Sequence, residues 1–328
     1  MRRTLPPPFG RLPTEQRNPA SRGIDARPAA AIVALLDREN GRVPRAVAAE
    51  AVRLTRGVGL IVARLRAGGG LLFVGAGTSG RLGVLEAAEC PPTFGVPRSL
   101  VSAAMAGGRS SVFRAKEGAE DDAGAGAAAV RRWAARRPMR LTPSPRRRRT
   151  GPLPRRRRVP GVVIGIAASG VTPFVRGALG AARGAGCRTI LVTSNALSPI
   201  REAEVVIAPR VGPELVAGST RLKAASAAKM VLNTLTTAAM ILLGKVHDGW
   251  MVDLKPTNRK LRDRALRMVA SLGGTAPDEA ERLFAQSGGR VKTAVLMART
   301  GLGRAQALRR LRECGGSLRD ALGGRESS

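Results

Sequence analysis

The chain has 328 residues, enough to bury a sizeable core, and 44% of them are hydrophobic, which excludes a chain that is disordered as a whole. The formal net charge of +33 suggests a nucleic-acid partner, but thirteen arginines between Arg131 and Arg158 leave only +20 for the rest. Phe and Trp together number eight and Tyr is absent, so few side chains can stack on bases, which argues against nucleic-acid binding.

Cysteine usage and the first residues indicate a reducing compartment. Cys90, Cys187 and Cys314 are scattered without a CxxC spacing, which argues against a disulfide framework or a zinc site. The start, MRRTLPPPFG, is basic and proline-rich and lacks the apolar stretch of a secretory signal. No run reaches the roughly 18 apolar residues that a membrane-spanning helix requires. We therefore expect a cytoplasmic protein with no membrane partner and no metal.

The N-terminal third is predicted to hold an arm, two helices and a strand–loop–helix unit. Residues 1–23 are polar and proline-rich and are expected to form an extended arm. Apolar residues recur at helical spacing over 24–36 and 44–65, which predicts two helices. A short apolar run at 71–74 then enters a glycine-rich turn, and 81–89 resumes a helical pattern. This order is typical of a strand, a loop and a helix.

The same unit recurs later in the chain. Residues 162–167 are a candidate buried strand, followed by a turn and a helix from about 173 to 185. Further short apolar strands are predicted at 189–193 and 205–208. Because strands alternate with helices, we expect an α/β fold with a parallel sheet covered on both faces.

Beyond these strands the pattern becomes helical. A long helix rich in Ala, Met and Leu is predicted over 220–243. From about Asn258, helical segments separated by glycine pairs predict a small helical domain, 258–328, after a main domain at 24–257.

The segment at about 134–160 fits neither domain. It holds two RRRR runs among six prolines, and like charges repel while prolines block helices and central strands. We interpret it as a disordered surface insertion. A tether to nucleic acid or to another acidic surface is the alternative.

Two loops carry the pattern of phosphate binding. Gly75-Ala76-Gly77-Thr78-Ser79-Gly80 matches GxGxxG, in which glycines let the backbone approach an anion at a helix N-terminus. A dinucleotide fold or a plain structural turn competes with this interpretation. The acidic residue that dinucleotide folds place about 20 residues further on is missing at 99–105. A second hydroxyl-bearing loop, Ser169-Gly170-Val171-Thr172, follows another predicted strand and favours a phosphomonoester.

The candidate ligand-binding residues come from three loops. A polar cluster at the start of the long helix is suited to hold an anion, although a capped helix with a surface salt bridge explains it equally well. The candidates are Gly77, Thr78, Ser79, Gly80, Ser169, Gly170, Thr172, Ser219, Thr220, Arg221 and Lys223.

Several collinear segments carry a more specific signal. They are TEQRNPAS (14–21), GAGTSGRLGVLEAAECPPTFG (75–95), EGAEDD (117–122), GIAASGVTPFVRGAL (165–179), GSTRLKA (218–224), KMVLN (229–233) and LGKV…MVDL (243–254). Together they resemble the N-acetylmuramic acid 6-phosphate etherases, a family with the sugar-isomerase (SIS) fold. The resemblance spans most of residues 12–300.

The resemblance implies a fold, an activity and an assembly. The fold is a three-layer αβα SIS fold with a parallel sheet, plus a small C-terminal helical domain. The activity is that of a lyase that needs no cofactor and converts a phosphosugar, N-acetylmuramic acid 6-phosphate, into N-acetylglucosamine 6-phosphate and D-lactate. The assembly is a homodimer.

The resemblance also assigns two catalytic carboxyl groups. Glu89 is the acid that protonates the leaving ether oxygen, and Glu120 is the base that removes the C2 proton. Two carboxyl groups can perform such an elimination, and the substrate aldehyde accepts the electrons, so no metal is required. His247 is the single histidine, which argues against histidine-based catalysis. A solvated acid at a helix start remains the alternative for Glu120.

Other functions stay open at this point. A non-catalytic phosphosugar regulator would also use an SIS fold, and an aldose–ketose isomerase would also remove a C2 proton. The family's Gly-Thr-Ala-Gln after GSTRLKA is replaced by Ala225-Ser226-Ala227-Ala228, which bears on activity. The presence of both carboxylates favours the enzyme, because binding a phosphosugar requires neither.

Overall fold

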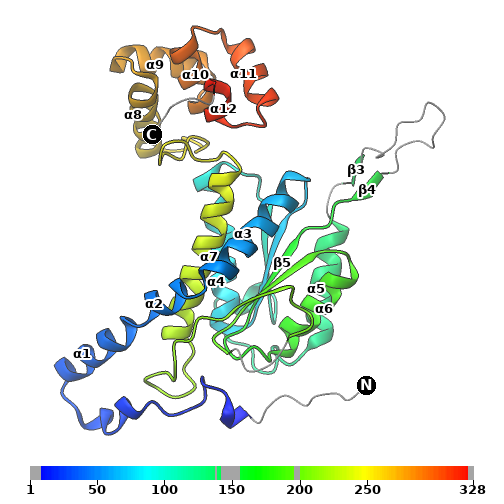
Figure 1. The fold of residues 1–328 in the computed structure, drawn as a ribbon, viewed down its shortest axis with the longest axis vertical. Helices are drawn as coiled ribbons and strands as arrows, with labels where there is room; N and C mark the ends of the chain where they lie inside the picture. The colour runs from blue at the N-terminus through cyan, green and yellow to red at the C-terminus, as the bar shows by residue number, and fades with distance from the viewer. Residues whose placement is uncertain (1–8, 137–138, 142–155, 196–199, 324–328) are drawn as a thin grey trace. The chain divides into compact units, whose positions relative to one another are not determined.

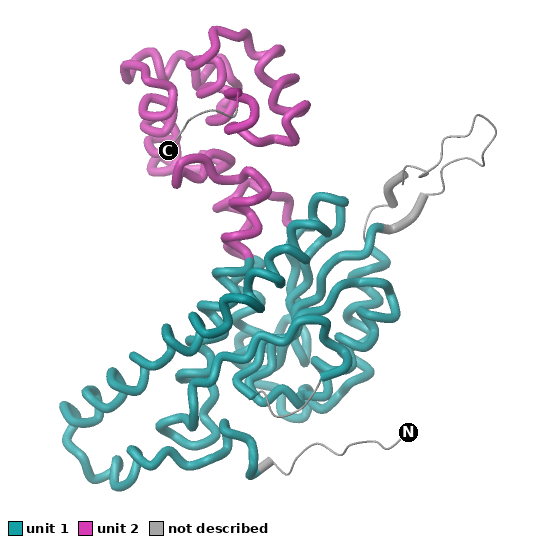
Figure 2. Tube along the Cα trace, in the orientation of Figure 1, with its two compact units in different colours: residues 1–87, 99–235 teal, residues 88–98, 236–328 magenta. Residues whose placement is uncertain are grey.

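The computed structural model describes residues 9–136, 139–141, 156–195 and 200–323. The chain forms two compact units (Figure 2). Unit 1 comprises Met1–Ala87 and Ser99–Leu235, and unit 2 comprises Ala88–Arg98 and Thr236–Ser328. Two helices, α4 (Gly77–Phe94) and α7 (Lys223–Leu242), contribute to both units. The domain boundary near Asn258 stays a prediction.

A five-stranded parallel sheet forms the centre of unit 1 in the part of the chain that the structure describes (Figure 1). Its order is β2-β1-β5-β6-β7. Every residue of the two central strands, β1 and β5, is buried, as expected for a parallel sheet with both faces covered. The strands are β1 (Leu71–Gly75), β2 (Val101–Met105), β5 (Val162–Ile166), β6 (Arg188–Val192) and β7 (Val205–Ile207). The predicted α/β fold with a parallel sheet is confirmed.

Helices cover both faces of this sheet. One face is covered by α5 and α6, whose buried side chains form one cluster with those of β1 and β5. On the other face, Gly57 of α3 lies against Leu235 of α7 and Ile190 of β6, and Gly83 of α4 lies against Phe73. The remaining helices of unit 1 are α1 (Ala29–Asn40), α2 (Val43–Ala48), α3 (Ala51–Arg66), α5 (Ala123–Ala135) and α6 (Pro173–Gly184).

Glycines bring α5 and α6 unusually close together. A Cβ at Gly126 would collide with the carbonyl oxygen of Phe174, and a Cβ at Gly177 would collide with that of Ala123. The sequence AGAGAAAV at the start of α5 therefore packs through its backbone rather than through large apolar side chains. Hydrophobic periodicity did not predict this helix for that reason.

Where the structure describes it, the predicted N-terminal arm belongs to unit 1 and is folded rather than extended. It contains the short 3₁₀ helices Phe9–Arg11 and Pro19–Ser21, and it buries Leu12, Thr14 and Asn18. Residues 1–8 lie outside the described residues.

The predicted Arg- and Pro-rich insertion lies mostly outside the described residues, at 137–138 and 142–155. Its described ends form an antiparallel pair, β3 (Met139–Leu141) with β4 (Arg156–Arg158). This pair leads into β5 at the amino edge of the sheet (Figure 1).

Helix α7 is the one helix in the described part of the chain that is long and apolar enough to cross a membrane. Its most apolar window is 44% buried, and core helices of soluble proteins pass the same test. In unit 1 its buried residues Val231, Leu232 and Leu235 face the core.

Unit 2 is helical in its described residues. Its core forms around α10, of which seven consecutive residues, Val291 to Met297, are buried. Asn258 caps α8 by accepting a hydrogen bond from the amide of Leu261 at 2.8 Å. The helices are α8 (Arg259–Gly273), α9 (Pro277–Gln286), α10 (Val291–Thr300), α11 (Arg304–Glu313) and α12 (Leu318–Leu322).

Candidate active site

The first glycine loop connects β1 to α4 through close backbone contact between Gly75 and Gly80. Gly77 has a positive φ of 52°, which favours glycine. A Cβ at Gly80 would lie 2.7 Å from the carbonyl oxygen of Gly75. This tight turn starts α4 at the carboxyl edge of the sheet, with the hydroxyl-bearing Thr78 and Ser79 half-buried in its first turn. Amides in the first turn of a helix lack intrahelical partners and favour an anion.

The second loop follows β5 and precedes α6. Gly170 has a φ of 75°, and the half-buried Ser169 and Thr172 flank it. Thr172 is the residue before α6, and its side chain makes no capping hydrogen bond to that helix. Its hydroxyl is therefore not used by the helix end. In a parallel sheet the loops after neighbouring strands emerge at the same edge, and β1 pairs with β5 from Leu71–Val162 to Gly75–Ile166.

Three polar residues after β6 support the second loop, and the sequence patterns did not single them out for this role. Thr193 donates from Oγ1 to the carbonyl oxygen of Ala168 at 3.0 Å, and the Asn195 side chain donates to that of Ser169 at 3.0 Å. The amide of Ser194 also donates to Ala168 O at 2.9 Å. All three residues are buried. The sequence feature that could have predicted this role is three consecutive polar residues directly after a buried strand. Polar groups that are buried there need hydrogen-bond partners, whereas those of a surface turn can bind solvent.

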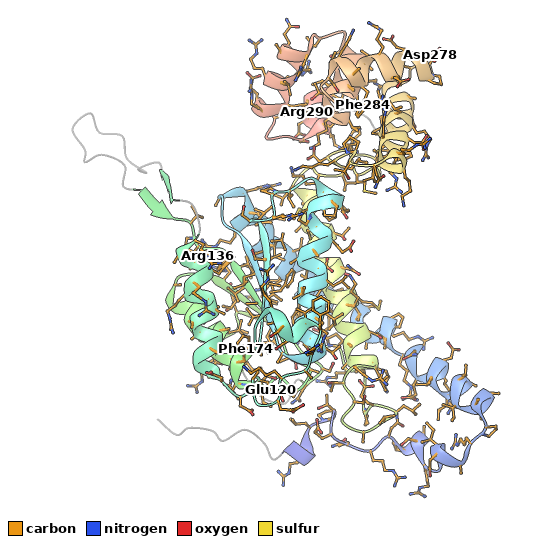
Figure 3. All side chains as sticks on the ribbon, turned by 180° about the vertical axis from the view of Figure 1, so that it is seen from behind. Glu120, Arg136, Phe174, Asp278, Phe284 and Arg290 are labelled. Atoms are coloured by element: carbon orange, nitrogen blue, oxygen red, sulfur yellow. The ribbon has the colours of Figure 1, made fainter. Side chains whose placement is uncertain are left out.

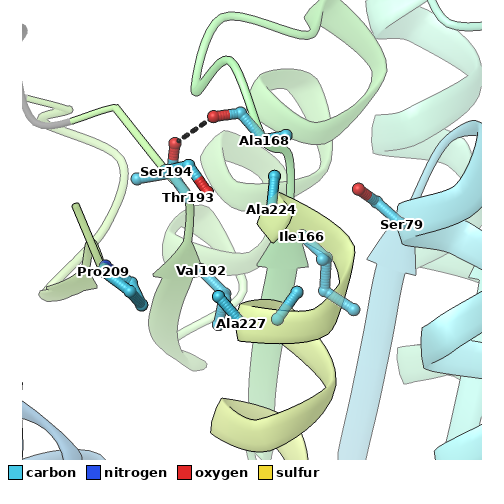
Figure 4. Close-up of a pocket in the computed structure, with 10 residues that line it drawn as sticks. Ser79, Ile166, Ala168, Val192, Thr193, Ser194, Pro209, Ala224 and Ala227 are labelled. Carbon is cyan, nitrogen blue, oxygen red and sulfur yellow. Dashed lines mark hydrogen bonds between the residues drawn. The ribbon is translucent and has the colours of Figure 1, made fainter. Parts of the chain in front are cut away.

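These elements enclose a small recess at the carboxyl edge of the sheet (Figure 4). Its hydroxyl groups come from Ser79, Thr193 and Ser194. Its apolar wall comes from Ile166, Ala168, Val192, Pro209, Ala224, Ala227 and Ala228. Two of the residues that depart from the family pattern, Ala227 and Ala228, therefore lie beside a predicted ligand-binding serine.

Glu120 is anchored through its backbone at the start of α6. Its carbonyl oxygen accepts a hydrogen bond from the amide of Phe174 at 2.9 Å, two residues after Thr172 (Figure 3). Its carboxylate is exposed. The neighbouring Asp122 caps α5 by accepting a hydrogen bond from the amide of Ala125 at 2.7 Å. The structure thus places the backbone of Glu120 at the first turn of α6, directly after the second glycine loop.

Glu89 lies on α4, three turns beyond the first glycine loop. Its sequence neighbours Ala87, Ala88 and Cys90 are apolar, but its side chain is exposed, and Leu85 one turn earlier is 42% exposed. The buried acid of this helix is Glu86 instead, which accepts hydrogen bonds from Lys229 at 3.0 Å and Asn233 at 2.9 Å. Lys229 and Asn233 are the two polar ends of the KMVLN segment, which the sequence left without a role.

The polar cluster before α7 is divided by burial. Ser219 and Thr220 are half-buried and Arg221 is exposed. Lys223 points into the protein, where its ammonium lies 2.6 Å from Glu39 Oε2 and its side chain is 2% exposed. Glu214, fully buried, accepts hydrogen bonds from the amides of Lys223 and Ala224 at 3.0 and 2.8 Å. The side chains of Ser219, Thr220 and Arg221 are thus available to a ligand. Lys223 is engaged in an ion pair.

Within the described residues, no group of three or more His, Cys, Asp or Glu side chains is placed to hold a metal ion. Among the predicted site residues of unit 1, the available groups are hydroxyls, backbone amides, the guanidinium of Arg221 and the carboxylate of Glu120.

Comparison with known proteins gives consistent similarities. Residues 53–141 match the family model of the glucokinase regulatory protein N-terminal SIS domain. An N-acetylmuramic acid 6-phosphate etherase from Serratia proteamaculans is 44% identical over 315 residues, covering 96% of this chain and 99% of that relative. One from Salmonella dublin is 45% identical over the same share of this chain.

Among solved structures, a protein of Escherichia coli CFT073 superposes with a TM-score of 0.42 and 17% identity. The match covers 68% of this chain and 97% of that one.

Proposed function

Because the chain belongs to the N-acetylmuramic acid 6-phosphate etherase family, we propose that it is a lyase that cleaves the D-lactyl ether of N-acetylmuramic acid 6-phosphate. The products are N-acetylglucosamine 6-phosphate and D-lactate. The observation that carries the proposal is the backbone hydrogen bond from Phe174 to Glu120, which anchors the backbone of a candidate base at the start of α6, directly after the second hydroxyl-bearing loop. A regulator that only binds phosphosugars needs no catalytic base beside that loop.

The two glycine loops bind the phosphate in this proposal. Amides at the start of α4 and the hydroxyls of Thr78 and Ser79 face it from one loop, and Ser169 and Thr172 face it from the other. Ser219, Thr220 and Arg221 meet the lactyl carboxylate, since a guanidinium suits a bidentate contact with a carboxylate. Lys223 is left out of this set because of its ion pair with Glu39.

The reaction is an elimination followed by an addition. In the open-chain substrate, Glu120 removes the C2 proton, and the electron pair forms the C2–C3 double bond. The C3–O bond breaks as Glu89 protonates the ether oxygen, so D-lactate leaves and an unsaturated aldehyde remains. Water then adds at C3, its hydroxyl bonding to C3 while a proton returns to C2. Each carboxyl contributes on the order of 10²–10⁴ in rate.

A cytoplasmic homodimer completes the proposal. Cys90, Cys187 and Cys314 form no disulfide within the described residues, which fits a reducing compartment. Large apolar side chains are exposed on unit 1, among them Val33 at 64%, Leu85 at 42% and Met230 at 37%. A second copy of the chain would cover such side chains. Sedimentation velocity at micromolar concentration would give a single dimeric species if this is so.

The activity test compares the wild type with Glu89→Gln and Glu120→Gln, which keep the side-chain shape. D-lactate release from N-acetylmuramic acid 6-phosphate should fall by about 10²–10⁴ in each variant. Glu117→Gln, an exposed acid three residues before Glu120, is the matched control and should stay within about twofold of the wild type.

Deuterium exchange separates the two roles. In D₂O, Glu89→Gln should still exchange the C2 proton of the substrate without releasing lactate, whereas Glu120→Gln should do neither. A folded wild type that binds the product yet releases no lactate would contradict the proposal and favour the non-catalytic regulator.

A further inference from the structure

A buried ion pair joins the start of α7 to α1 in unit 1. Lys223 Nζ lies 2.6 Å from Glu39 Oε2, and each side chain is 2% exposed. Asn18 of the N-terminal arm donates from Nδ2 to the same carboxylate oxygen at 2.8 Å. Arg42 Nη1 lies within ion-pair distance of the other oxygen, at 3.2 Å, and extends to the surface. Three separate segments therefore converge on one carboxylate.

The hydrogen bonds in this cluster favour the charged form of Glu39. Burial by itself would raise the pKa of the Glu39 carboxyl, but the hydrogen bonds from Lys223 and Asn18, together with the positive charges of Lys223 and Arg42, hold the pKa below its ordinary value. Removing one partner would leave a buried charge without compensation, which is strongly unfavourable.

Two further hydrogen bonds join the N-terminal arm to the loop that precedes α7. Asn18 Nδ2 also donates to the carbonyl oxygen of Pro213 at 3.1 Å. The amide of Gly218 donates to the carbonyl oxygen of Thr14 at 3.1 Å. At its C-terminal end the loop is held by Glu214, which accepts the first amides of α7. The loop 213–222 is thus fixed at both ends before it presents Ser219, Thr220 and Arg221.

We propose that Lys223 is a positioning residue, and that together with Glu39 and Asn18 it fixes the loop 213–222 so that Ser219, Thr220 and Arg221 face the substrate. The inference rests on the proposed function, because that function assigns the loop to the lactyl carboxylate. It makes the N-terminal arm part of the substrate site through Asn18, although the arm supplies no catalytic group. The two cationic side chains of the GSTRLKA segment then have different roles. Arg221 faces outward and binds the substrate, and Lys223 faces inward and fixes the loop 213–222.

A double-substitution experiment separates a positioning lysine from an anion-binding one. Lys223→Met leaves Glu39 buried without its ammonium, so kcat/KM should fall by at least about tenfold, mainly through KM, with a lower Tm. Glu39→Gln leaves Lys223 unpaired and should have a similar effect. The combination of Lys223→Met with Glu39→Gln removes both charges and should recover kcat/KM to within about threefold of the wild type, together with Tm.

A Lys223 that contacts the substrate directly would give a different result in the double variant. Neutralising Glu39 cannot restore a cation that contacts the substrate, so a double variant with recovered Tm and unrecovered KM would overturn the proposal. The matched control is Arg262→Met with Glu281→Gln, an exposed pair in unit 2 at 2.8 Å, which should change neither Tm nor KM.

Asn18→Ala keeps the proposal testable if the charge variants fold poorly. It removes three side-chain hydrogen bonds, those to Glu39 and Pro213 and the one from the amide of Ala20, and no charge. KM should therefore rise by about three- to tenfold while kcat stays nearly constant. An unchanged KM would contradict the positioning role of the arm. Failure of the proposed function would look different: the wild type itself would release no lactate, while the Tm values of the charge variants would still show whether the pair is coupled.

Discussion

The two glycine loops at the carboxyl edge of the sheet are held in their conformations by different kinds of contact. The first, 75–80, is shaped by backbone contact, since a Cβ at Gly75 or Gly80 would press on the backbone of the other. The second, 168–172, is shaped by side chains that follow β6, chiefly the hydroxyl of Thr193 and the amide of Asn195. The first loop therefore depends on the absence of side chains, and the second depends on the chemistry of particular ones.

The largest effect should come from adding a methyl group to the first loop. In Gly80→Ala the Cβ would lie 2.7 Å from Gly75 O and 2.9 Å from Met105 Cγ, and the backbone oxygen cannot move aside. We expect a loss of about 1–3 kcal/mol in the free energy of unfolding and a severe loss of substrate binding. Urea unfolding and lactate release would measure both.

The control for that change is Gly180→Ala on α6. Nothing lies within 4 Å of a Cβ at Gly180, so the substitution should be neutral or stabilise the protein by about 0.5–1 kcal/mol. Equal damage from both substitutions would mean that close contact is not what shapes the first loop.

A smaller effect should come from removing one hydroxyl under the second loop. Thr193→Val keeps the side-chain shape but loses the bond to Ala168 O and the acceptor for the amide of Asn195, at 3.0 and 3.1 Å. The free energy of unfolding should fall by about 1 kcal/mol relative to the wild type, and KM should rise. Thr55→Val, on the exposed side of α3, removes a similar local bond to Ala51 O and should affect KM by less than about twofold.

Ser79→Ala should separate ligand binding from loop shape. The half-buried hydroxyl has no part in the contacts that shape the first loop, so stability should change by less than about 0.5 kcal/mol. The loss of a hydrogen bond to a charged phosphate should raise KM by about tenfold. A loss of stability as large as that of Thr193→Val would contradict this division.

Low pH should destabilise a third loop, 213–222, and leave the two glycine loops unchanged. The contacts that shape the glycine loops are made by backbone and neutral side chains, whereas the loop 213–222 depends on Glu39. The pKa of Glu39 is lowered on folding from 4.5, so its stabilising contribution is complete above that pH and is lost as the pH falls through the folded value.

This acid dependence can be tested by substitution. Between pH 6 and acid denaturation, about the range where carboxyl groups become protonated, unfolding free energy should fall less steeply in Glu39→Gln than in the wild type. Glu281→Gln, which alters an exposed pair, should follow the wild type. Identical slopes in all three proteins would remove Glu39 from the account of acid stability.

Sequence reasoning found the elements whose signals are local. The glycine loops and the buried strands β1, β5 and β6 combine an apolar run with turn residues, and the structure has them where predicted. It missed β2, in which Ser102, Ala103 and Ala104 interrupt the apolar pattern. It missed α5 because that helix packs through glycine and alanine.

The candidate site was predictable in its residues and not in their surroundings. Burial of Lys223 depends on Glu39, which is 184 residues away along the chain, and on an arm that was expected to be extended. The support of the second loop by Thr193 and Asn195 depends on which strands are neighbours in the sheet. The roles of Glu89 and Glu120 remain predictions from the family resemblance.

The entry of the Arg-rich segment at the amino edge of the sheet has a practical consequence. The β3–β4 pair leads into β5, and the second glycine loop, which we propose binds the substrate, follows the other end of that strand, about 16 Å away for five residues. Evolution could lengthen the chain at this position without redrawing the chemistry at the opposite edge. The same position is therefore where a reporter domain or an affinity handle would be grafted into the protein without touching catalysis.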